Sequence, residues 1–183
     1  MMPENSAQTS IHLNILFLAF LDICLLRSGP QRLPASSFLL GLTLLAYFLT
    51  GLLVLGLDFS LGMSAWLSFL DIFVLLSVLS FALRRAGHSE RFHQVAIAAI
   101  GCSTLLSLLS YPISLWLINA HEANGDADSP SLLLLMLLIW SMVVLGHIIH
   151  EGIERSRFVG VMYALSYWLL AMSLFGVFVP NVE

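Results

Sequence analysis

Asp71 is the only charged residue in a long apolar stretch, residues 63–83. Placing a carboxyl group in hydrocarbon is costly, so an acid in such a stretch commonly marks a proton or ion pathway. Ser64 and Ser68 lie seven and three residues earlier, which puts them on the same face of a helix. We therefore expect Asp71 to be the centre of a polar layer inside the protein. Whether its carboxyl group is ionised is left open.

A matching stripe of serines occurs in a second apolar stretch, residues 95–118. Its members follow the spacing of one helix face. They are Ser103, Ser107, Ser110 and Ser114. We expect the last three to form one intramembrane polar layer with Asp71. The alternative is that these small hydroxyl residues only allow helices to pack closely and to form hydrogen bonds with each other.

Two histidines and two glutamates share one helix face near the end of a third apolar stretch. They are His147, His150, Glu151 and Glu154. Imidazole and carboxylate groups are ligands that Zn²⁺ and similar divalent ions accept. The order His-x-x-His-Glu differs from the His-Glu-x-x-His of zinc proteases. The alternative is a solvated helix end or a partner surface, with Glu151 paired to Arg155 and Glu154 to Arg157.

Signatures of catalysis are missing from the sequence. It has no Gly-x-Ser-x-Gly turn, no phosphate-binding loop and no paired-cysteine motif. Cys24 and Cys102 each lie in an apolar run, which is typical of buried free cysteines. We therefore expect no enzymatic activity, and no cofactor other than the divalent metal considered above.

The elements that position these residues must be membrane helices. Only 10% of the residues are charged and 59% are hydrophobic, whereas a soluble domain carries about 25% charged residues. A helix that spans a bilayer needs about 20 apolar residues, and five stretches satisfy this length. They are residues 35–57, 63–83, 95–118, 131–150 and 158–179. The predicted fold is an all-α integral membrane protein with five transmembrane helices.

The basic residues predict the orientation of the bundle. All seven are arginines, and the five spans place every one on the same side of the membrane. They are Arg27, Arg32, Arg84, Arg85, Arg91, Arg155 and Arg157. The positive-inside rule then predicts a cytoplasmic N-terminus and a periplasmic C-terminus, with residues 180–183 as an external tail. We expect this surface to contact anionic lipid headgroups. It is too sparsely charged for nucleic-acid binding.

One further apolar run, residues 11–26, precedes the first span. It is short for a span and contains His12, Asn14 and Asp22. We expect a short amphipathic helix in the cytoplasmic interface or docked on the bundle, within an N-terminal region of residues 1–34. The alternative is a sixth span, which would break the one-sided arrangement of arginines.

Two short stretches, with the five-span layout, resemble the Yip1-domain superfamily, in particular its short bacterial members. They are residues 27–36, RSGPQRLPAS, and residues 140–149, WSMVVLGHII. The resemblance implies a bacterial inner-membrane protein. Eukaryotic members act in vesicle traffic and associate with small GTPases. Their acidic Asp-Leu-x-Gly-Pro-type motif is reduced here to Gly29 and Pro30, so that role is not carried over.

Two functions follow as expectations. The first is a non-enzymatic membrane partner, assembly or scaffold component, Yip1-like, that works by helix–helix contact with partner proteins or as a homo-oligomer. The alternative is a small transporter, or a permease linked to protons or metal ions, that uses Asp71 and the cluster of His147 and His150. A water-accessible cavity that reaches Asp71 would favour the transporter, and a closed, dry layer would favour the scaffold.

Overall fold

The computed structural model describes residues 16–123 and 125–178, and this part of the chain is helical and has no β-strand. Five helices are long and apolar enough to cross a membrane, which confirms the predicted fold class. They are α2 (Ser37–Leu55), α3 (Leu61–Ala86), α4 (Phe92–Glu122), α5 (Asp128–Ile153) and α6 (Arg157–Phe178). Two short 3₁₀ turns, η1 (Pro30–Arg32) and η2 (Ser89–Arg91), precede α2 and α4. The predicted tail 180–183 and residues 11–15 lie outside the described residues.

Local sequence signals set the ends of these helices. The Ser36 hydroxyl accepts a hydrogen bond from the Leu39 N–H and caps α2. Gly87 ends α3 in the left-handed conformation, at φ 81°. Asp126 precedes α5, and its carboxylate accepts hydrogen bonds from the backbone N–H groups of Asp128 and Ser129. These contacts hold the pKa of Asp126 below its usual range, led by its hydrogen bond from the Ser129 hydroxyl.

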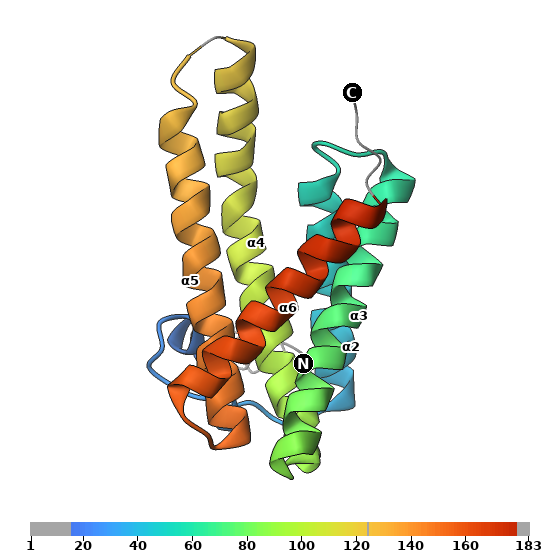
Figure 1. The fold of residues 1–183 in the computed structure, drawn as a ribbon, viewed down its shortest axis with the longest axis vertical. Coiled ribbons are helices and arrows are strands. Elements are labelled where there is room, and N and C mark those ends of the chain that lie inside the picture. The colour runs from blue at the N-terminus through green and yellow to red at the C-terminus, as the bar shows by residue number, and fades with distance from the viewer. Residues whose placement is uncertain (1–15, 124, 179–183) are drawn as a thin grey trace, which may run out of the picture.

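The helices are packed tightly at one end of the bundle and diverge at the other. Figure 1 shows α4 and α5 upright as a pair, while α6 crosses obliquely from the base of α5 toward the top of α3. The fully buried side chains follow this arrangement, because they concentrate in the first part of α4 and the last part of α5. In α4 the buried run is residues 95–102, and in α5 most residues from 144 to 153 are buried. The remaining lengths of α4 and α5 are mostly half-buried or exposed.

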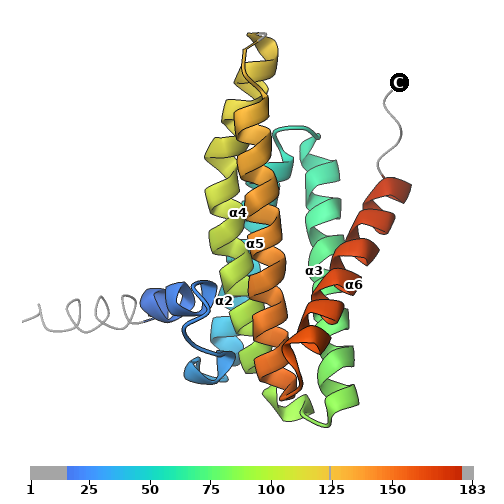
Figure 2. The same ribbon diagram turned by 60° about the vertical axis from the view of Figure 1, so that its left-hand side comes forward.

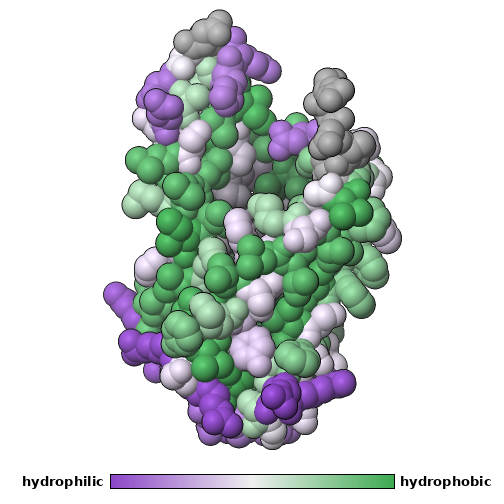
Figure 3. All heavy atoms as spheres, in the orientation of Figure 1, coloured by the Kyte–Doolittle hydropathy of each residue, from purple (hydrophilic) through white to green (hydrophobic). Residues whose placement is uncertain are grey.

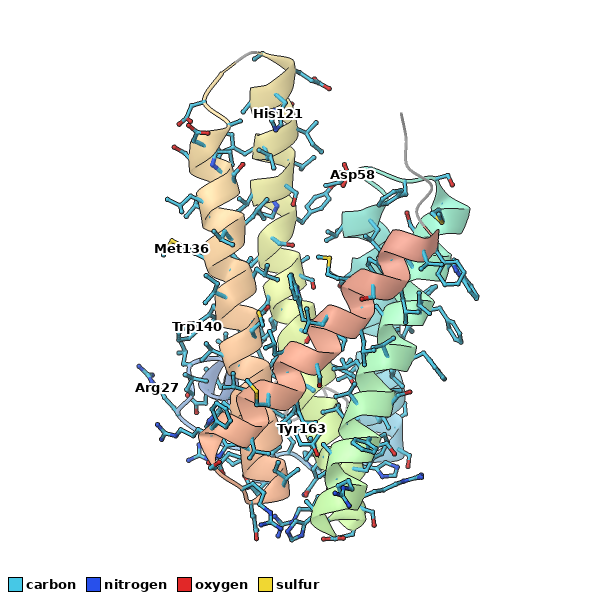
Figure 4. The ribbon with its side chains drawn as sticks, in the orientation of Figure 1. Arg27, Asp58, His121, Met136, Trp140 and Tyr163 are labelled. Carbon is cyan, nitrogen blue, oxygen red and sulfur yellow. The ribbon has the colours of Figure 1, made fainter. Side chains whose placement is uncertain are left out.

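The tightly packed end also carries the arginines. Here Arg91 contacts Glu154, and the Gln94 side chain donates a hydrogen bond to the Leu33 carbonyl, so the N-terminal segment and two interhelical turns meet. Asp58 and His121 lie toward the opposite end, whereas Arg27 lies low in the same view (Figure 4). Figure 3 shows an apolar band between these hydrophilic ends on the face in view. The chain therefore has the polarity of a multi-pass membrane protein.

A short helix at residues 16–24 is the described part of the predicted interfacial helix. It lies across the bundle rather than along it (Figure 2). Phe20, Ile23 and Cys24 are buried, whereas Phe17 and Leu18 are exposed. Gly101 on α4 permits this docking, because a Cβ there would lie 2.7 Å from Cδ1 of the Phe20 ring. Cys24 and Cys102 are buried and not linked by a disulfide, as the sequence predicts.

Helices α5 and α6 touch backbone to backbone at two glycines. A Cβ added to Gly160 would lie 2.7 Å from the His150 Cβ and 2.9 Å from its backbone nitrogen. A Cβ added to Gly146 would lie 3.2 Å from the Val161 Cα. Small residues at such crossings are a common basis of helix association in membranes. This crossing fixes the base of α6 against α5.

We predict that Gly160→Ala destabilises the protein, because the added methyl group meets the backbone of α5. Overpacking of this kind costs about 1–3 kcal/mol. Gly41→Ala is the matched control, since a Cβ at Gly41 meets nothing within 4 Å, and its effect should stay below about 1 kcal/mol. Thermal unfolding of both variants in detergent measures the difference. Equal midpoints for the two variants would contradict the predicted crossing.

Candidate functional site

The carboxyl group of Asp71 holds three helices together. The Tyr47 hydroxyl on α2 donates a hydrogen bond of 2.5 Å to Oδ2. The Tyr167 hydroxyl on α6 donates one of 2.6 Å to Oδ1. Both oxygens of Asp71 thus lie within hydrogen-bond distance of a tyrosine hydroxyl. Contacts of this length lie at the short end of the range for O–H···O hydrogen bonds.

Asp71 lines a cavity inside the bundle. The cavity has a volume of about 200 Å³, and Tyr47, Ser68, Asp71 and Ser107 are among the residues that line it. The Ser68 hydroxyl is buried and has no hydrogen-bond partner within the described part of the chain. Leu55 and Phe175 contribute apolar wall. An apolar cavity with a few polar residues in its wall has the composition of a site for a small ligand.

A second cavity adjoins the first. Its volume is about 280 Å³, and Tyr47 and Ser107 line both cavities. The second extends between α4, α5 and α6, where its polar lining residues are Ser103, Ser107, Ser110, Ser141, Tyr47 and Tyr167. Figure 3 shows the surface hollowed between the upper parts of α4 and α5 on one side and α6 on the other. The divergence of the helices therefore leaves a hollow at the level of the Asp71 site.

The predicted polar layer is formed by partly different residues. Asp71 and Ser107 line the first cavity, and Ser110 lines the second, whereas Ser114 is in the lining of neither. The Ser110 hydroxyl donates to the carbonyl of Ser107 on its own helix. The direct partners of Asp71 are tyrosines instead of serines.

Sequence reasoning missed Tyr47 and Tyr167. One signal was present. A buried tyrosine hydroxyl usually finds a hydrogen-bond partner, and an apolar helix offers it none of its own, since the backbone groups are already paired. An acid on another span was the obvious acceptor. Pairing these residues still requires the rotation of each helix about its axis, which spacing within one helix does not supply.

The histidine cluster is smaller than the predicted one. His147, His150 and Glu151 each offer a ligand atom, and these atoms lie within 4.8 Å of one another. Glu154 faces elsewhere, with Oε1 2.6 Å from Arg91 Nη1 and Oε2 3.8 Å from His88 Nε2. The reason is local, because Glu154 follows the last residue of α5 and has a left-handed backbone at φ 50°. The helical repeat that placed Glu154 on the shared face no longer holds there.

The predicted arginine surface lies around this cluster. Arg91 is half-buried beside Glu154. Nη1 of Arg32 lies 3.6 Å from Oδ2 of Asp22. The other five side chains are exposed, and they are Arg27, Arg84, Arg85, Arg155 and Arg157. Contact of these arginines with lipid headgroups stays a prediction.

Comparisons of the chain with protein-family models, curated proteins and solved structures found no match. The resemblance to the Yip1-domain superfamily thus stays a prediction. The function must be argued from the chemistry of the site.

We predict that Tyr47→Phe and Tyr167→Phe each destabilise the bundle, because each removes one donor from the Asp71 carboxyl group. A hydrogen bond contributes about 0.5–1.5 kcal/mol, and about 1.5–3 kcal/mol where the acceptor is charged. Tyr163→Phe is the matched control on α6, since its ring packs edge-to-face on Phe81 and the described residues make no hydrogen bond to its hydroxyl, only to its backbone carbonyl. Unfolding in detergent measures all three. A control loss as large as the other two would contradict this role.

The ion pair at the arginine-rich end predicts a pH dependence. The hydrogen bond and charge of Arg91 hold the pKa of Glu154 below its usual value of 4.5. A carboxyl group whose pKa is lower in the folded than in the unfolded state stabilises the folded protein at pH values above the unfolded-state pKa. This stabilisation is lost as the pH falls through the folded-state pKa. Wild type should therefore melt above Glu154→Gln at pH 7, and the gap should close below about pH 4.5.

The control for this experiment is Arg84→Gln, which removes an exposed arginine from the same end of the bundle. Its melting temperature should differ from wild type by an amount that does not follow the titration of Glu154. A gap between wild type and Glu154→Gln that is the same at pH 3 and pH 7 would show that the ion pair contributes nothing.

Proposed function

We propose that the protein is a small transporter that takes a small cation, or a small molecule rich in hydrogen-bond donors, into the bundle at Asp71. The single observation that carries this proposal is the cavity of about 200 Å³ that the Asp71 side chain lines. A scaffold protein, whose helices only pack on partners, does not require a cavity beside Asp71, the acid within its membrane helices. Intramembrane acids that face a cavity are characteristic of substrate and ion pathways.

The lining of the cavities indicates the class of substrate. Asp71 is the only acidic or basic side chain in their lining, and when ionised it supplies a negative charge. Its oxygens already accept hydrogen bonds from Tyr47 and Tyr167, but each tyrosine oxygen can still accept one. The serine hydroxyls add acceptors. Cavities of 200 and 280 Å³ are below the range of about 300–1,000 Å³ that drug-sized ligands fill, so the substrate is small.

The shape of the bundle supports a carrier that is open toward one side. Packing is tight at the arginine-rich end, and the hollow lies toward the end with Asp58 and His121 (Figures 3 and 4). With a cytoplasmic N-terminus in a bacterial inner membrane, which we also propose, this state faces the periplasm. Release to the cytoplasm then requires the helices at the arginine-rich end to separate and the hollow to close.

The Yip1-like scaffold is the other expectation, and it stays a prediction. Exposed leucines on α2, among them Leu42, Leu45, Leu49 and Leu53, would contact lipid or a partner helix equally well. They therefore favour neither function. The cavity is the feature that a scaffold leaves unexplained, and for this reason we place the transporter first. The histidine cluster is not part of its pathway in our proposal, since neither His147 nor His150 lines these two cavities.

Cysteine accessibility tests whether the cavity contains water. In a background with Cys24→Ala and Cys102→Ala, Ser107→Cys places a thiol in the lining of both cavities. We expect a positively charged methanethiosulfonate reagent, added from the side with Asp58, to modify it. Leu108→Cys is the matched control, since Leu108 is the next residue on α4 and its side chain is 52% exposed on the outer surface. Equal reaction rates at the two positions would overturn the water-filled cavity.

Uptake tests the role of Asp71. We expect proteoliposomes with a membrane potential, negative inside, to accumulate radiolabelled methylammonium, a small cation with hydrogen-bond donors. Asp71→Asn removes the charge at nearly constant shape and should reduce uptake at least about tenfold, the change that 1.4 kcal/mol produces. Asp58→Asn in the loop after α2 should leave uptake unchanged. Wild-type uptake that equals empty liposomes, or that survives Asp71→Asn, would overturn the proposal.

A further inference from the structure

We infer that His147, His150 and Glu151 form a binding site for one divalent transition-metal ion of the Zn²⁺ type. The site lies at the arginine-rich end of α5, and the N-terminal segment around Ser28 and Gln31 forms its outer wall. It is independent of the transport proposal, because these residues line neither of the two cavities at Asp71.

The spacing of the ligand atoms is close to that of a metal site. In a tetrahedral zinc site with Zn–N and Zn–O bonds of about 2.1 Å, two ligand atoms lie about 3.4 Å apart. His150 Nε2 lies 3.6 Å from Glu151 Oε1. All three ligand atoms lie within 4.8 Å of one another. The largest separation therefore exceeds the tetrahedral spacing by at most about 1.4 Å.

His150 has a buried ring nitrogen, Nε2, that lacks a hydrogen-bond partner among the described residues. Glu151 Oε1, at 3.6 Å, is just beyond hydrogen-bond distance. The nitrogen therefore loses its contact with water and gains no hydrogen bond in return, which is unfavourable. A metal ion between His150 Nε2 and Glu151 Oε1 gives both atoms one. A neutral imidazole nitrogen and a carboxylate oxygen are also the forms in which these side chains bind zinc.

His147 is oriented by a hydrogen bond to the backbone of Ser28. Its Nε2 lies 3.1 Å from the Ser28 carbonyl oxygen. A carbonyl oxygen only accepts, so Nε2 carries the proton and the neutral ring presents the lone pair of Nδ1. Histidines that bind metals almost always donate their other N–H to a carbonyl or carboxylate, which fixes the ring and its tautomer. The Ser28 carbonyl has this role here.

Glu151 is held in a similar way. The Gln31 side-chain amide donates to Oε2 at 3.3 Å and contacts the Glu151 backbone carbonyl at 3.4 Å. Oε1 is left to face His150. The segment that contains Ser28 and Gln31 thus positions two of the three ligands. Metal binding should in turn hold this segment, and the short helix before it, against α5.

The donor set selects the class of ion. Two imidazoles and one carboxylate suit Zn²⁺ and neighbouring transition metals, whereas Mg²⁺ and Ca²⁺ require oxygen ligands. Glu154 is not a ligand, because Arg91 and His88 occupy its carboxylate. This exclusion distinguishes the inferred site from the four-residue face that the helical repeat predicts.

Calorimetric titration with ZnCl₂ tests the site in the full chain, purified in mild detergent without a polyhistidine tag and stripped with chelator. We expect one ion per chain. Glu151→Gln and His150→Ala should weaken binding at least about tenfold. Glu154→Gln and His93→Ala remove a carboxylate and a histidine from the same end of the protein, and both should bind as wild type.

Hydrogen exchange provides a readout that does not depend on the variants. Addition of ZnCl₂ to wild type should slow exchange in residues 28–33 and leave the external turn between α4 and α5 unchanged. Absence of stoichiometric binding by wild type would overturn the inference, and so would equal affinity of Glu151→Gln and Glu154→Gln. Because Glu151 lies partly exposed at the surface, its replacement by the isosteric glutamine leaves the fold intact even if His150→Ala does not fold.

Discussion

A carboxyl group within a membrane helix must be given partners by other helices, because lipid offers none. In this protein two tyrosines meet that requirement, and each comes from a different helix, so α2 and α6 are both tied to α3 at Asp71. The hydrogen bonds do more than compensate a cost. They also join α6 to α2 and α3 at a level beyond most of the fully buried side chains, which lie nearer the arginine-rich end.

The bundle therefore has two regions with different physics. Toward the arginines, aliphatic side chains and glycines bring the helices together, and turns and the N-terminal segment add polar contacts. Farther along, α4 and α5 separate from α6, and polar side chains line the space that results. A region held by a few directional bonds can rearrange at lower cost than a close-packed core. That contrast suits a protein that binds a ligand in its open half.

The fold could be predicted because its signals lie within single helices. Length, apolar composition and the one-sided arginines depend on no contact between segments, and the prediction of five helices long and apolar enough to cross a membrane is confirmed. The partners of Asp71 could not be predicted in this way. Spacing shows that Ser107 and Ser110 share a face, but the rotation of α4 about its axis decides what that face meets. The prediction that Glu154 belongs to the histidine cluster was wrong for a different reason. The helical repeat that placed it there ends with α5 at Ile153.

The two polar sites are separate in space, yet α6 contacts both. Gly160 at its base packs on the backbone of His150, a member of the histidine cluster. Tyr167, seven residues or about 10 Å farther along the helix, donates to Asp71. Helix α6 crosses α5 at the glycines and then leans toward α3 (Figures 1 and 2). A small change in tilt at the glycine crossing would thus move the Tyr167 hydroxyl relative to Asp71. One helix thus contacts both His150 on α5 and the carboxyl group of Asp71.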